Sequence, residues 1–129
     1  MLNEKTRFEG ADPILSVRNM AAAVRYYVDV LGFQNATWGD ENFTSVNRDH
    51  AGIYLCAGEH QGHPGAWVWV GVEDAEMLYN ELKASGARVR HAPRNYPWAL
   101  EFHVEDIDGN VLRMGSEPKT NRPYDEWMP

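Results

Sequence analysis

The feature that most constrains the fold of this chain is an internal repeat. Residues 98–115, WALEFHVEDIDGNVLRMG, have the pattern of a strand, a tight turn at Gly109 and a second strand. A weaker copy, FTSVNRDHAGIYL, lies 57 residues earlier and has Gly52 at the corresponding turn. A strand–helix unit also recurs, over residues 17–32 and again over residues 72–86. A chain that contains one module twice is expected to place a binding site between the two copies.

The first module begins with a strand and a helix. Residues 12–18, DPILSVR, have the composition of a strand, and Asn19 suits the N-cap of a helix that follows. Apolar side chains then recur at helical spacing as far as Leu31, and Gly32 is predicted to end the helix. Further strands are expected over residues 33–38, 43–48 and 52–57.

The second module repeats this order. A strand is predicted over residues 66–72, and Asp74 caps a helix that ends at Gly86. The remaining strands are expected over residues 88–91, 98–104 and 110–114, with a loop between Pro93 and Pro97. The sequence therefore predicts an α+β fold in which two βαβββ modules form a cupped mixed sheet with the helices outside.

The expected organisation is one domain over residues 1–129. Module one occupies about 12–58, a polar linker 59–65, module two 66–115, and an extended tail 116–129. The aromatic side chains of this tail suit docking on a neighbouring molecule.

The charge and cysteine content exclude several classes of protein. Twelve basic and nineteen acidic residues give a net charge of −7, which argues against binding to nucleic acid. No apolar run approaches the roughly 20 residues needed to span a membrane. The N-terminal residues lack the apolar core of a signal peptide, so a cytoplasmic location is expected. The single cysteine, Cys56, rules out an internal disulfide and a cysteine-rich zinc site.

Four segments carry a resemblance to a known family. They are PILSVRNMAAAVRYYVDVLGF (13–33), AGIYL (51–55), VWVGVEDAEMLYNELKASGARV (68–89) and EFHVEDIDGNVL (101–112). In this order and spacing the chain resembles the glyoxalase/bleomycin-resistance/dioxygenase family, also called the vicinal oxygen chelate fold. Ile107 replaces the proline that is usual in the last turn. The resemblance implies a homodimer with two sites, each of which can be built from both chains.

The resemblance also allows a test of the family's metal site. Metal-dependent members hold a divalent ion with one His, Glu or Gln from each of four strands. Counting from the shared motifs places those positions at Asp12, Cys56, Trp67 and Arg113. An indole nitrogen only donates hydrogen bonds, and a guanidinium stays positively charged, so these four residues are not a metal quartet. We therefore expect no metal, no cofactor and no catalytic residue, and the sequence leans away from an enzyme.

Two other interpretations stay open at this point. The chain can be a metal-dependent lyase, isomerase or dioxygenase of the same fold, with a displaced metal near His91, Glu101 and His103. It can also be a dimeric structural or regulatory module whose cup is closed by aromatic packing, in which case all five tryptophan side chains would be buried.

The favoured prediction is an aromatic binding cup. Strand alternation places Trp67 and Trp69 on one face of a strand, with Val68 and Val70 on the other. The predicted ligand-binding residues are aromatic or charged, and they are Trp38, Tyr54, Trp67, Trp69, Trp98, Glu101, His103 and Arg113. Indoles stack on planar groups and attract cations. The sequence thus predicts a metal-independent protein, resembling the bleomycin-resistance proteins, that sequesters a planar or cationic small molecule.

Overall fold

The first module forms a four-stranded mixed sheet. The computed structural model describes residues 5–59 and 61–128. The strands of this sheet are β1 (Ile14–Val17), β2 (Gln34–Asn35), β3 (Phe43–Arg48) and β4 (Ala51–Ala57). Their order is β1-β4-β3-β2, in which β1 and β4 run parallel and the other neighbours antiparallel. Because β1 and β4 are parallel, the chain must cross over between them, and the helical segment after β1 lies across one face of the sheet.

The second module forms the corresponding sheet with one addition. Its strands are β5 (Trp67–Gly71), β6 (Arg88–Val89), β7 (Arg94–Asn95), β8 (Leu100–Glu105) and β9 (Val111–Ser116). The order is β5-β9-β8-β6, and β7 pairs with β8 beside β6. The α+β class and the repeated modules are thus confirmed. The short strand β7 was not predicted, since it lies in the loop between Pro93 and Pro97.

The two predicted helix starts are confirmed by their caps. The Asn19 side chain accepts a hydrogen bond from the Ala22 amide at the start of α1 (Met20–Arg25). Asp74 accepts one from Met77 at the start of α2 (Ala75–Ala84). The first helix does not stay α-helical to Leu31; it widens into a π-helical segment, η1 (Tyr26–Val30). No helix among the described residues has both the length and the apolar character that a membrane crossing requires.

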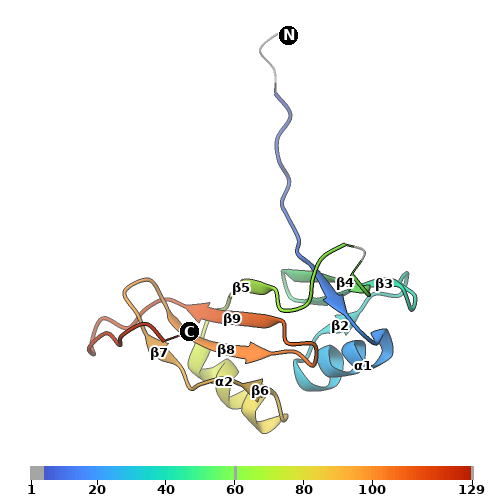
Figure 1. The fold of residues 1–129 in the computed structure, drawn as a ribbon. Helices are drawn as coiled ribbons and strands as arrows, with labels where there is room; N and C mark the ends of the chain where they lie inside the picture. Colours follow the sequence, from blue (N-terminus) through green and yellow to red (C-terminus); the bar gives the residue numbers. More distant parts are fainter. Residues whose placement is uncertain (1–4, 60, 129) are drawn as a thin grey trace.

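Both helices pack on the same side of the two sheets (Figure 1). Each strand presents alternate residues to that side, and those residues form the core. Buried residues of these strands include Leu15, Val17, Val46, Ile53, Leu55, Phe102, Val104, Leu112 and Met114. The helices cover these apolar faces, and the opposite face of each sheet is not covered by a helix.

The two modules are joined through the turn between β8 and β9. Asp106 in this turn accepts a hydrogen bond from the hydroxyl of Tyr27, on η1, at 2.9 Å. Asn110 donates to the carbonyl of Ser16 in β1. Arg18 forms an ion pair of 2.9 Å with Asp108. The turn that carries the sequence repeat therefore also fastens one module to the other.

Candidate functional site

The candidate site lies on the face of the second sheet that the helices leave uncovered. The register places Trp69 beside Arg113, and Arg113 beside His103. Trp67 and Glu101 share this face because each lies two residues from one of these positions. Val68 and Val70 point the other way and pack against the core, as the alternation predicted.

The carboxylate of Glu101 is the centre of this face. It is fully buried and accepts four hydrogen bonds. Its Oε1 accepts from His103 Nε2 at 2.8 Å and from Arg113 Nε at 2.9 Å. Its Oε2 accepts from Trp98 Nε1 at 2.8 Å and from a terminal nitrogen of Arg113 at 3.1 Å. A carboxylate offers about four acceptor positions, so Glu101 is saturated by its own chain.

His103 is a buried donor to Glu101. A carboxylate only accepts hydrogen bonds, so His103 Nε2 must carry the proton that it donates to Glu101. The other ring nitrogen, Nδ1, is buried and has no partner among the described residues. Burial lowers the pKa of His103 below its ordinary value of 6.5, although the bond to Glu101 acts in the opposite direction. We call Glu101, His103 and Arg113 the charged floor of the site.

Indole rings surround the charged floor. Arg113 lies with its guanidinium carbon 5.4 Å from the centre of the Trp69 ring. Trp67 meets His103 edge-on at 5.4 Å between ring centres. Gly115, next but one to Arg113, leaves room for Trp69, because a Cβ at that position would overlap the indole. These contacts pack part of each ring and leave the rest open.

Two further aromatic residues belong to this face and were not among the predicted site residues. Tyr96 stacks on Trp98 with ring centres 4.8 Å apart. Trp127, from the C-terminal tail, lies 4.9 Å above the guanidinium carbon of Arg113 and 5.8 Å from His103. The tail thus docks on its own chain. We call Trp67, Trp69, Tyr96, Trp98 and Trp127 the second-sheet cluster.

The other predicted residues belong to module one, Tyr54 on β4 and Trp38 in the loop between β2 and β3. Tyr54 on β4 stacks on Phe43 of β3 at 5.4 Å between ring centres. Trp38 lies 6.4 Å from Tyr54 and 6.2 Å from Phe43. We call Trp38, Phe43 and Tyr54 the first-sheet cluster. Within the described residues, no ring contact joins the two clusters, so the structure places the eight predicted residues in two groups.

The exposure of the tryptophans bears on the interpretation of a closed module. That interpretation expects every indole to be buried in the dimer. In the single chain, all five tryptophan side chains are between 43% and 60% exposed. Aromatic packing within one chain therefore does not close these faces.

Each of the residues proposed for a displaced metal makes hydrogen bonds within the chain, while His91 Nε2 and His103 Nδ1 have no partner among the described residues. His91 lies beside His103, with ring centres 4.6 Å apart, but its Nδ1 is bonded to the carbonyl of Ala92. Glu101 is saturated as described above. In the part of the chain that the structure describes, no group of three His, Cys, Asp or Glu side chains is placed to hold a metal ion.

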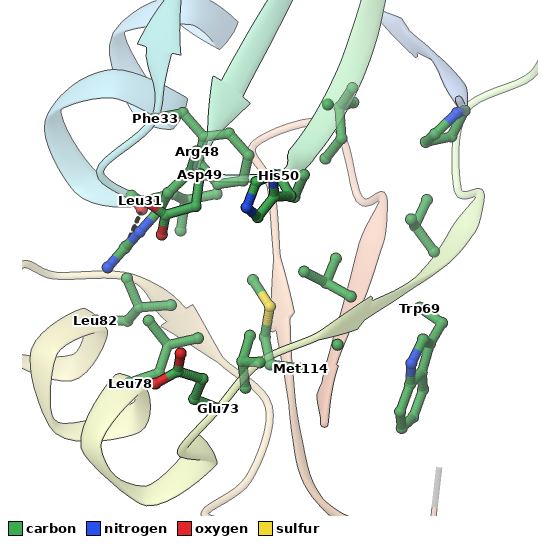
Figure 2. Close-up of a pocket in the computed structure, with 18 of the residues that line it drawn as sticks. Leu31, Phe33, Arg48, Asp49, His50, Trp69, Glu73, Leu78, Leu82 and Met114 are labelled. Carbon is green, nitrogen blue, oxygen red and sulfur yellow. Dashed lines mark hydrogen bonds between the residues drawn. The ribbon is translucent and has the colours of Figure 1, made fainter. Parts of the chain in front are cut away.

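A hollow of about 820 Å³ lies elsewhere. Leu31 and Phe33 contribute to it from module one, and Leu78, Leu82 and Met114 from module two. Figure 2 shows these apolar side chains facing the hollow, with Trp69 at some distance from them. Of the residues in the second-sheet cluster, Trp69 alone also lines this hollow.

Comparison with known proteins places this geometry in a family. The sequence profile of the Glyoxalase/Bleomycin resistance protein/Dioxygenase superfamily matches residues 10–114. A search of curated proteins finds no matching sequence.

Several solved structures share the fold. The bleomycin-binding protein of Streptomyces verticillus, complexed with copper(II)-bleomycin, superposes with a TM-score of 0.75 at 27% identity, covering 89% of this chain and 100% of that one. A bleomycin-binding protein complexed with bleomycin gives 0.70 at 22% identity, with coverage of 85% and 99%. TioX from Micromonospora sp. ML1 gives 0.70 at 19% identity, with coverage of 87% and 98%. With a profile match over most of its length and a fold that agrees, the chain belongs to the Glyoxalase/Bleomycin resistance protein/Dioxygenase superfamily.

Proposed function

We propose that this protein binds and sequesters a planar or cationic small molecule without a metal and without chemistry. The observation that carries the proposal is the second-sheet cluster, in which half-exposed indoles surround a charged floor. An indole that is packed on one side and open on the other offers a stacking surface for planar groups and for cations.

The hydrogen bonds of Glu101 suit a supporting role in a binding site and not the role of a general base. A general base needs a free lone pair within reach of its substrate. All four acceptor positions of Glu101 are filled by its own chain, and its side chain has no exposed surface. Glu101 therefore serves to hold Arg113, His103 and Trp98 in place. The 27% identity with a protein solved in complex with copper(II)-bleomycin makes a glycopeptide of that kind the first ligand to test.

The proposed cup is completed in a homodimer. The tryptophans of the first-sheet and second-sheet clusters are each about half exposed. Two copies related by a two-fold axis can place the first-sheet cluster of one copy opposite the second-sheet cluster of the other, which makes two equivalent cups. The predicted cytoplasmic location remains a prediction.

Ligand binding can be tested by tryptophan fluorescence. Bleomycin and a panel of planar and cationic compounds would be titrated into the protein, and each mixture would also be heated to measure the melting temperature. We expect at least one compound to quench the fluorescence and raise Tm, and Trp69→Ala to weaken its binding about tenfold. Phe8→Ala is the matched control, since Phe8 is an aromatic residue that is 96% exposed and belongs to neither cluster. Absence of quenching and of any thermal shift across the panel would contradict the proposal.

Elemental analysis separates this proposal from an enzyme with a metal. Protein purified without chelators is expected to contain no stoichiometric divalent ion. A stoichiometric metal that is lost in Glu101→Ala would favour the metal-dependent enzyme instead.

A further inference from the structure

The C-terminal tail is fastened to the second sheet by one buried residue. Asn95 on β7 is only 2% exposed. Its side chain accepts a hydrogen bond from the amide of Lys119 at 2.8 Å and donates to the carbonyls of Lys119 and Pro123 at 2.8 and 3.3 Å. Its backbone amide donates to the carboxylate of Asp125, and its carbonyl accepts from the amide of Asp125, both at 2.7 Å. We call this set of five hydrogen bonds the Asn95 latch.

A second attachment lies on the other side of Trp127. The amide of Met128 donates to the hydroxyl of Tyr96 at 3.4 Å, and Arg94 donates to the carbonyl of Met128 at 3.1 Å. Trp127 is therefore held between the Asn95 latch at Asp125 and these contacts at Met128. A tail fixed on both sides of one residue loses most of its backbone freedom, so the indole has a defined position.

The position of Trp127 is over the charged floor. Its ring lies above Arg113, and its centre is 5.4 Å from that of Tyr96 and 5.9 Å from that of Trp98. Arg113 thus has Trp69 and Trp127 both within cation–π distance. Trp127 still exposes 43% of its surface, which is close to the values of the other indoles in the second-sheet cluster.

We propose that the tail is part of the ligand site, with Trp127 as a ligand-stacking residue and Asn95 as the residue that positions it. This inference rests on the proposed binding function and adds a wall that β-strand residues alone do not supply. A planar group of the ligand stacks on the open face of Trp127, while the packed side of that indole stays on Arg113. The indole gains a preorganised position because the Asn95 latch holds the tail before the ligand arrives.

The test uses the full chain and bleomycin as the probe, or the compound of the panel that quenches most strongly. Trp127→Ala is expected to weaken binding about tenfold, because a stacking surface is removed. Trp127→Phe, which keeps a smaller ring, is expected to stay within about threefold of the unaltered protein. Tyr124→Ala is the matched control in the same tail, since Tyr124 is exposed and lies outside the second-sheet cluster; it should leave the affinity unchanged.

A second readout tests the positioning role of Asn95. Asn95→Ala is expected to weaken binding in the same direction as Trp127→Ala, and to raise the rate of amide hydrogen exchange in residues 117–128 at least about tenfold. Trp127→Ala should leave the exchange of the Lys119 and Asp125 amides slow, because the Asn95 latch remains.

Three results would overturn the inference. Unchanged affinity in Trp127→Ala, while Trp69→Ala still weakens binding, would remove the tail from the site and leave the proposed function standing. Tighter binding in Trp127→Ala would mean that the indole competes with the ligand for the charged floor. If no compound of the panel binds the unaltered protein, the proposed function fails and this inference fails with it.

Discussion

A single carboxylate organises the chemistry of the candidate site. Glu101 contacts Trp98, His103 and Arg113, and it supplies the only negative charge of the charged floor. Hydrogen bonds of this kind, between a buried carboxylate and charged or polar donors, are strong when complete and costly when one partner is lost. The position of each neighbouring indole therefore depends on this residue.

Replacing Glu101 should cost far more stability than replacing an exposed acid. Glu101→Ala leaves three donors without their acceptor, so we expect the free energy of unfolding to fall by about 3 kcal/mol. Glu105→Ala is the control on the same strand. Its ion pair with Arg90 is about one third exposed and should be worth less than about 1 kcal/mol. Urea unfolding followed by circular dichroism measures both, and equal losses in the two variants would contradict the assigned role of Glu101.

The two neighbouring histidines predict a loss of stability in weak acid. Burial lowers the pKa of His103 and of His91 below the ordinary value of 6.5. The unfolded chain therefore takes up protons first as the pH falls through about 6.5, and the free energy of unfolding decreases from there toward the folded pKa. We expect Tm to fall between about pH 7.5 and pH 5.5, a range in which ordinary carboxylates stay ionised.

A pair of variants isolates the histidines. His91→Gln combined with His103→Gln should flatten the dependence of Tm on pH, whatever its effect on Tm itself. His63→Gln, at an exposed position outside this pair, is the control for a His→Gln substitution. A slope that persists in the double variant would assign the effect to other groups.

At the scale of elements, the hairpin of β8 and β9 carries both the turn and the floor of the site. Its turn ends at Gly109, whose φ of +83° is a left-handed conformation that residues with a Cβ seldom adopt. No atom lies within 4 Å of the position that a Cβ would take there. Gly109 is thus required by backbone conformation alone, whereas Gly115 is required by the space that Trp69 occupies.

Substitutions at these two glycines should separate folding from binding. Gly109→Ala is expected to lower the free energy of unfolding by about 1–2 kcal/mol, and Gly109→Asn should recover part of that loss, since asparagine tolerates the left-handed region. Gly115→Ala should instead displace Trp69 and weaken ligand binding. Urea unfolding and fluorescence titration of all three variants provide the comparison. Loss of binding in Gly109→Ala alone would reverse this assignment.

The sequence predicted the order of the elements well, because alternation, helical spacing and caps are local signals. Asn19 and Asp74 lie at the predicted caps, and the Asp-Gly turn lies between two strands as expected. The π-helical turn and β7 were missed, since neither has a local signature. The docking of Trp127 depends on Asn95, which is about 30 residues away, and no spacing rule connects the two. Alternation also gave the face of each strand, but not the sheet to which a strand belongs.

At the scale of the whole molecule, the two clusters lie on separate sheets. Among the described residues of one chain, no aromatic ring of the first-sheet cluster contacts a ring of the second-sheet cluster. A cup lined by both clusters therefore needs a second chain. This arrangement is the basis for the proposed homodimer, in which each copy supplies one half of each cup. It also makes the two halves separable by mutation.

Complementation between variants tests the shared cup. Trp38→Ala impairs the first-sheet cluster and Trp67→Ala the second-sheet cluster, so each variant alone should bind the ligand weakly. When the two are co-expressed, a mixed dimer has one cup with both halves intact and one with both impaired. We expect up to about half of the sites in mixed dimers to recover normal affinity. No recovery in dimers verified by sedimentation would mean that each site is built within one chain.

The different settings of the two chain ends have a practical consequence. Residues 5–11 extend away from the body of the protein (Figure 1), and Phe8 among them is almost fully exposed. The C-terminal end is held by Arg94 and Tyr96 beside Trp127. An affinity tag or fluorescent fusion at the C-terminus would therefore lie next to Trp127 and the other rings of the second-sheet cluster. Purification handles and surface tethers belong at the N-terminus if ligand affinities are to reflect the native protein.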